Sequence, residues 1–98
     1  MKIIQKLSEM IDEEISDARR YARCAAEYKD SDPELSRTFA QLSTEELGHM
    51  EKLHAQVVRI IRKYREEKGE PPAHMLAIYE YLHERSVGKA AEVRLLLA

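Results

Sequence analysis

Apolar residues recur along most of this chain at alternating steps of three and four, the spacing that keeps side chains on one face of an α-helix. The pattern divides into three segments and predicts helices over about residues 2–29, 33–68 and 73–97. Asp32 and Pro33 are typical of a helix start, and Gly69 followed by Pro71 is typical of a helix end. We therefore expect an all-α fold, a single helical domain with a long antiparallel hairpin and a third C-terminal helix.

The apolar stripe of the second predicted helix contains two polar residues. The stripe consists, in order, of Leu35, Phe39, Leu42, Glu46, His49, Leu53, Val57, Ile60 and Tyr64. Burying a carboxylate and an imidazole without partners would cost several kcal/mol, so a compensating group is expected. A Glu followed three residues later by a His is the ligand pair that di-iron and di-manganese helical bundles present from their cores. Glu46 and His49 are therefore predicted to be metal ligands.

The first predicted helix supplies a third candidate ligand. Its stripe consists of Ile4, Leu7, Ile11, Glu14, Ala18, Tyr21, Ala25 and Tyr28. Glu14 lies on this stripe, whereas Glu13 lies on the flank. Counted from Ser31 in the turn, Glu14 is 17 residues back, and Glu46 and His49 are 15 and 18 residues forward. At about 1.5 Å per residue, all three lie roughly 25 Å from the turn. The hairpin register thus predicts that Glu14 joins them.

Two further Glu-x-x-His pairs have the same spacing. Glu51 points away from the stripe, so we assign its pair with His54 to a solvated face, although His54 borders the stripe and is a candidate to support the ligands. Glu80 and His83 are the third pair. If they pointed inward, the third helix would donate ligands and a single chain could hold a monomeric three-helix site.

The third helix is expected to cover residues 58–64, the end of the second helix that outruns the first. The residues expected to form its apolar face are Met75, Ile78, Tyr79, Leu82, Val93, Leu96 and Leu97. Gly48 stands inside the second helix, where Gly costs about 1 kcal/mol against Ala. It indicates either close helix approach or space beside His49.

Composition excludes some classes of function. A net charge of −2 gives no electrostatic reason to expect nucleic acid as a partner. No apolar run approaches membrane-spanning length, so no membrane partner is expected. The single Cys excludes an internal disulfide and favours a reducing compartment. We expect a cytoplasmic helical protein.

One chain supplies only half of a binuclear centre. Such a centre in a four-helix bundle uses a Glu from each of two helices and a Glu-x-x-His from each of two others. This chain has one clear copy of each. A homodimer, or a larger oligomer built from dimers, would supply two copies of each residue and close a four-helix bundle between the chains.

Glu14 to Tyr21, with residues 45–49 in the next helix, resemble the ferritin-like superfamily. The resemblance covers about residues 7–65 and is to the half-bundle encapsulated-ferritin type, and more distantly to rubrerythrins. It implies that Glu14, Glu46 and His49 hold two iron ions between two chains, with Tyr21 beside them as a hydrogen-bonding partner of a ligand. It implies ferroxidase activity, in which Fe(II) is oxidised by oxygen for iron storage or detoxification. It also implies residence in a protein nanocompartment. The mostly apolar residues 93–98 do not look like a tail that would target the protein to such a shell.

Two other functions remain open from the residues alone. Polar stripe residues could fix the register of a non-catalytic helical dimer, as single buried polar residues do in coiled coils. Alternatively, the same ligands could hold Zn or Mn as a structural or stored ion, with no oxidation.

Overall fold

Residues 2–98 are described by a computed structural model, in which the chain forms a three-helix bundle. The helices are α1 (Lys2–Tyr28), α2 (Pro33–Lys68) and α3 (Ala73–Leu97). The all-α architecture is confirmed, and each helix begins and ends within one residue of its expected bounds. The bundle is a rod whose Cα atoms extend 56 × 18 × 18 Å.

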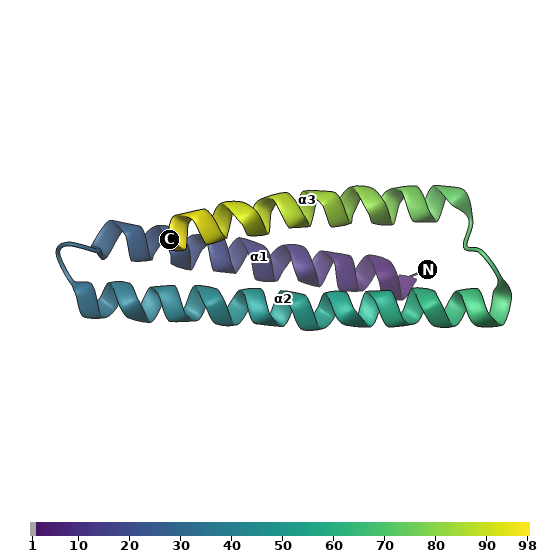
Figure 1. Cartoon of the computed structure of the whole chain (residues 1–98), viewed down its shortest axis with the longest axis horizontal. Helices are drawn as coiled ribbons and strands as arrows, with labels where there is room; N and C mark the ends of the chain where they lie inside the picture. The colour runs from purple at the N-terminus through teal and green to yellow at the C-terminus, as the bar shows by residue number, and fades with distance from the viewer. Residues whose placement is uncertain (1) are drawn as a thin grey trace.

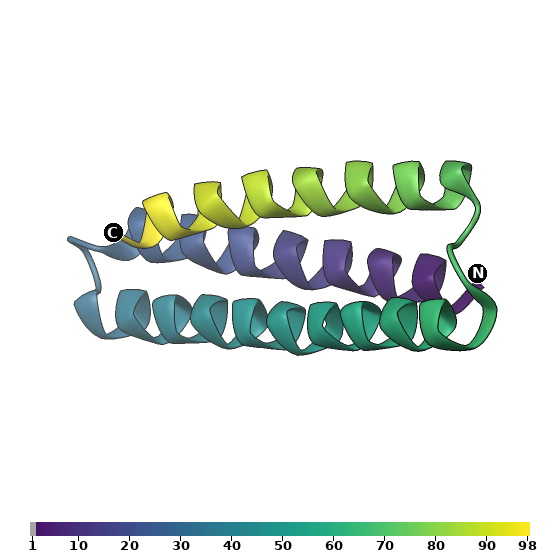
Figure 2. The same cartoon turned by 45° about the vertical axis from the view of Figure 1, so that its right-hand side comes forward.

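The helices lie side by side along the rod (Figure 1). α1 and α2 form the antiparallel hairpin, and α3 returns alongside α1 in the same direction, as Figure 2 also shows. α1 packs extensively against both other helices. α2 and α3 meet mainly through long side chains rather than close backbone approach.

Local capping explains where α2 begins and ends. The backbone N–H of Leu35 donates to the Asp32 carboxylate at 3.2 Å, and Pro33 occupies the first turn. At the other end Gly69 has φ 83°, which residues with a Cβ rarely adopt, and its N–H donates to the Arg65 carbonyl at 3.1 Å.

The core consists of two clusters along the rod. One contains Ile4, Ile11, Ile15, Val57 and Ile61, and the other contains Ala18, Ala22, Leu47, Ala90 and Val93. The alanines allow close helix approach, and the buried Ser43 hydroxyl donates across the hairpin to the Ala18 carbonyl at 2.6 Å. Because Ile4 packs in the same cluster as Ile61, α1 itself reaches the end of α2 that was expected to outrun it.

The expected apolar stripes of the hairpin coincide with this core only in part. On α1, the stripe residues Ile4, Ile11, Ala18 and Ala25 are buried, whereas Glu14 and Tyr21 are only half-buried. On α2 the buried residues are Ser43, Leu47, Val57 and Ile61. The reason is that α3 packs on one side of the hairpin, so that residues of α1 and α2 facing α3 are buried. The stripe residues that are not buried, among them Glu14, Tyr21, Glu46 and His49, lie on the other side, which we call the open face.

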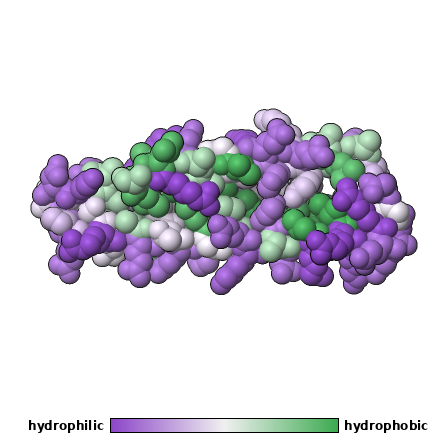
Figure 3. All heavy atoms as spheres, in the orientation of Figure 1, coloured by the Kyte–Doolittle hydropathy of each residue, from purple (hydrophilic) through white to green (hydrophobic). Residues whose placement is uncertain are grey.

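The apolar face expected for α3 was wrong in part. Ile78 and Leu96 are exposed, whereas Ser86 and Ala90 are buried. Apolar residues surround most of this helix, so its sequence does not mark a single buried side. Figure 3 shows apolar side chains in two patches on the face that carries α3, one over its C-terminal half and one near its start.

Candidate metal centre

Three side chains that are distant in sequence converge on the open face. Glu14 of α1 and Glu46 and His49 of α2 each offer one ligand atom, and these atoms lie within 4.8 Å of one another. His49 Nδ1 is 3.4 Å from a Glu14 oxygen and 3.8 Å from a Glu46 oxygen. Within residues 2–98, no other group of three His, Cys, Asp or Glu is so placed. The hairpin register therefore brings together the three residues that counting through the turn singled out.

The three side chains are more exposed than their stripe positions suggested. Exposed fractions are 26% for Glu14, 21% for Glu46 and 53% for His49. The expectation that burial in one chain forces a compensating ion was therefore wrong, because water reaches these groups in the single chain. Their convergence, and not their burial, is the observation that points to a cation.

The two carboxyl groups disturb one another. A hydrogen bond shared with Glu14, burial and the Glu14 charge raise the pKa of Glu46 above its usual value, and the nearby His49 offsets this in part. Two neighbouring carboxylates repel one another when both are ionised, and a bound proton or cation reduces this repulsion. The arrangement therefore has the charge and the oxygen donors that a divalent ion requires.

Asp17 also belongs to this environment, although it is not on the predicted stripe of the first helix. Its charge also raises the pKa of Glu46. Asp17 is half-buried and is paired with Arg20 at 3.4 Å. The sequence feature that could have identified Asp17 is its position three residues after Glu14, one helical turn along the same side.

Tyr21 lies on the open face as a packed aromatic ring. Its ring centroid is 6.3 Å from that of Phe39, and the Arg20 guanidinium carbon is 5.8 Å from the Tyr21 centroid. In the part of the chain that the structure describes, the Tyr21 hydroxyl has no hydrogen bond to Glu14 or Glu46. A role for Tyr21 in orienting a ligand stays a prediction for the assembled protein.

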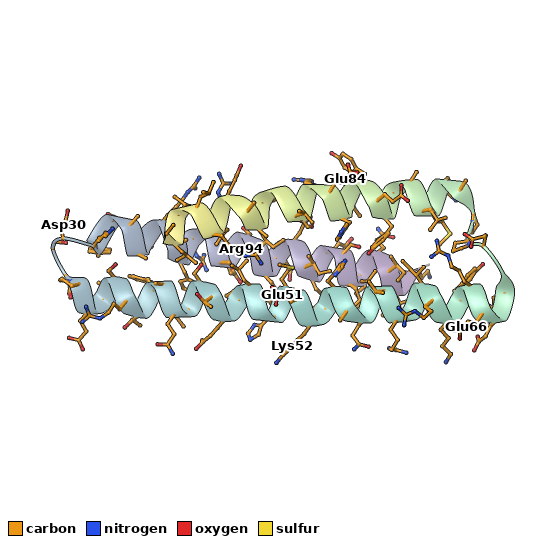
Figure 4. The ribbon with its side chains drawn as sticks, viewed as in Figure 1. Asp30, Glu51, Lys52, Glu66, Glu84 and Arg94 are labelled. Atoms are coloured by element: carbon orange, nitrogen blue, oxygen red, sulfur yellow. The ribbon has the colours of Figure 1, made fainter. Side chains whose placement is uncertain are left out.

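The other candidate ligands lie elsewhere. His54 stacks on His83 with ring centroids 4.5 Å apart, on the side of α2 that faces α3. Glu51 pairs with Arg94 at 3.2 Å, and Figure 4 shows these two side chains pointing toward one another between α2 and α3. Glu80 is exposed. The structure therefore does not bring Glu80, His83 or His54 to Glu14, and a three-helix site built on them is not formed.

Gly48 lies beside open space and does not contact a neighbouring helix closely. A Cβ added to Gly48 would meet nothing within 4 Å. Of the two explanations offered by its position in a helix interior, close helix approach was wrong. The open space at Gly48 belongs to a groove between α2 and the end of α3, which Thr44, Glu51 and Arg94 also line and His49 does not.

No protein-family model, curated protein or solved structure matches this chain. None of the helices in the described residues is long and apolar enough to cross a membrane. The interpretation of the site therefore rests on its donor set. Two carboxylates and one imidazole suit Fe, Mn or Zn, and three donors from one chain leave coordination positions for further groups.

Proposed function

We propose that this chain is a ferritin-like di-iron protein whose metal centre forms between two copies. The observation that carries the proposal is the convergence of Glu14, Glu46 and His49 on a face that α3 leaves uncovered. A second copy facing the first across a two-fold axis would bring the same three residues, because such an interface uses the same surface on both partners. Two sets of three are the ligand complement of a binuclear carboxylate bundle.

The surroundings of the cluster support a copy of this chain as the partner. Half-buried apolar side chains flank it along both helices of the hairpin: Leu7, Tyr21, Phe39, Leu42 and Leu53. Burying apolar surface of this kind favours association. The facing hairpin would also reduce the exposure of His49 and exclude water from the ligands.

The residues fit the chemistry that the proposal requires. Glu14 and Glu46 supply hard oxygen donors that suit Fe(III), and His49 supplies a nitrogen donor for Fe(II). Asp17 adds negative charge beside them and favours the arrival of cations. Iron held there would supply the electrons that oxygen takes up in a ferroxidase reaction. A reducing cytoplasm would keep both the incoming Fe(II) and the lone Cys24 reduced.

The test is oxygen consumption after anaerobic loading with Fe(II), together with the measured mass of the particle. Wild type is compared with Glu14→Ala and His49→Ala. The matched controls are Glu51→Ala and His74→Ala, which alter a Glu and a His of the described chain outside the cluster. We expect one iron per chain, association strengthened by iron, and rapid oxygen uptake that both cluster variants lose and both controls keep.

Other outcomes separate the remaining functions. Tight binding of iron, Zn or Mn that depends on Glu14 and His49 without oxygen uptake would assign a structural or storage metal site. Dimers that form equally with and without metal, with no metal-dependent difference between variants, would assign a structural helical dimer. A metal-bearing monomer would contradict the proposed shared centre.

A further inference from the structure

A separate cavity of about 200 Å³ lies where all three helices meet. Its walls include Ser8 and Ile11 of α1, Met50 and His54 of α2, and Tyr79, Leu82, His83, Ser86, Val87 and Ala90 of α3. Glu14, Glu46 and His49 do not line it. One water molecule occupies about 30 Å³ of liquid, so the cavity has room for several waters or for one small organic molecule.

Two serine side chains in this wall have no hydrogen bond to the protein, and their hydroxyl oxygens are accessible rather than sealed off, since within the described residues the buried side-chain atom without a partner is Arg19 Nε. Ser8 and Ser86 are each 8% exposed, and neither side chain has a hydrogen bond within the described residues 2–98. Ser43, the other buried serine, donates to the Ala18 carbonyl at 2.6 Å. The two hydroxyls line the cavity and can therefore hydrogen-bond with a molecule that enters it.

The remaining polar groups of the wall are those of Tyr79, His54, His83 and the ion pair between Glu51 and Arg94. The Tyr79 hydroxyl is 3.3 Å from His54 Nε2, and the stacked rings of His54 and His83 are inclined by only 14°. Burial, reinforced by the charge of His83, lowers the pKa of His54 and keeps its ring neutral. Arg94 also lines the cavity, but its charge is compensated by Glu51 at 3.2 Å.

We propose that this cavity binds a small neutral ring compound that carries a hydroxyl or carbonyl group, of the size of a phenol or quinol. The ring would occupy the apolar part of the cavity beside Ile11, Met50 and Leu82. Its polar group would hydrogen-bond with the free hydroxyls of Ser8 and Ser86. A charged ligand would lose its hydration without meeting an unpaired counter-charge, so a neutral one is favoured. The proposal is independent of metal binding on the open face.

The test titrates phenol and toluene into the full chain and follows the ring signals of the histidines by NMR. We expect saturable shifts at His54 and His83 with phenol in the millimolar range, and none at His49. Toluene has the same ring without the hydroxyl. It should bind about three- to tenfold more weakly, the effect of roughly one hydrogen bond.

Two substitutions at one position separate polar recognition from filling of space. Ser86→Ala removes the hydroxyl with little change of volume, so phenol affinity should fall by about three- to tenfold while toluene affinity stays the same. Ser86→Leu should occupy the cavity and abolish both. Ser16→Ala, at an exposed serine of α1, is the matched control and should change neither.

Ser8→Ala removes the other cavity hydroxyl, which α1 supplies, and should weaken phenol binding in the same way. It tests the proposal even if Ser86→Leu does not fold. Helical content and thermal unfolding are measured for every variant. Absence of saturable shifts at His54 and His83, or phenol binding unchanged in both alanine variants, would overturn the proposal and leave ordered water as the occupant.

Discussion

Two clusters of polar side chains on α2 differ in almost every physical respect. His49 lies with two carboxyl groups on the open face, where charge is dense and water has access. His54 lies five residues later against Tyr79 and His83 beneath α3, where the three side chains are half-buried and burial lowers the pKa of His54. Both histidines follow a Glu at the same spacing, so their local sequences look alike.

The difference follows from helix geometry and from the position of α3. Five residues turn an α-helix by about 140° beyond a full turn, so His49 and His54 point to different sides of α2. One side meets α1 and the open face, and the other meets α3. The neighbours of each histidine, and not the Glu-x-x-His spacing, therefore decide whether the pair can hold a cation.

The strongest way to break this comparison is to remove one carboxylate of the open-face cluster and, separately, the carboxylate three residues before His54. Glu14→Ala should lower the affinity for a divalent ion by about 100-fold or more, since loss of groups that merely support ligands already costs 10–100-fold. Glu51→Ala should change the affinity by less than about threefold, because Glu51 pairs with Arg94. Competition with a metal-binding dye measures both. Equal losses would show that the two carboxylates are equivalent and that the assignment is wrong.

A second change tests whether the open-face cluster depends on α3. Val93 is fully buried against Ala18, Ala22 and Leu47, so Val93→Ala should lower the free energy of unfolding by about 1–3 kcal/mol. Chemical denaturation measures the loss, and metal affinity should stay within about threefold of wild type. Leu95→Ala is the control, since Leu95 is 77% exposed. A large fall in metal affinity in Val93→Ala would mean that α3 shapes the metal site.

The cluster around His54 should make the protein less stable in mild acid. Because burial and His83 lower the pKa of His54 below its usual 6.5, the unfolded chain takes up a proton before the folded chain does. This stability is fully present above pH 6.5 and is lost as the pH falls from there through the folded pKa. His54→Gln should flatten the pH dependence of the free energy of unfolding, and His74→Gln should not. An unchanged slope in His54→Gln would contradict the lowered pKa of His54.

The open-face cluster should give the free energy of unfolding a pH dependence of the opposite sign, and the smallest of the predicted effects. Because Glu14 and burial raise the pKa of Glu46, the metal-free folded chain takes up this proton before the unfolded chain. Stability should therefore rise as the pH falls through the raised pKa toward 4.5. Glu46→Gln should remove this rise, whereas Glu45→Gln on the exposed flank should keep it. Denaturation of metal-stripped protein measures both, and a rise that persists in Glu46→Gln would assign the proton to another group.

The helices and the hairpin register could be predicted because both depend on local rules. Asp32 and Gly69 mark the ends of α2 by backbone capping. A constant rise per residue then places Glu14 level with Glu46 and His49 once the turn is located. The exposure of His49 could not be predicted, since it depends on which side of the hairpin a third helix covers, whereas Asp17 could have been identified from its position one turn after Glu14.

The sequence by itself determined three helices, their bounds and the level along the hairpin at which the three candidate ligands Glu14, Glu46 and His49 meet. Only the tertiary structure decided that α3 packs opposite these ligands, that His54 meets His83, and that Ser8 and Ser86 face a shared cavity. The physical reason is that helix rise and capping act within a few residues. The docking side of α3, a helix with apolar residues around most of its circumference, is selected by contacts between residues far apart in the chain.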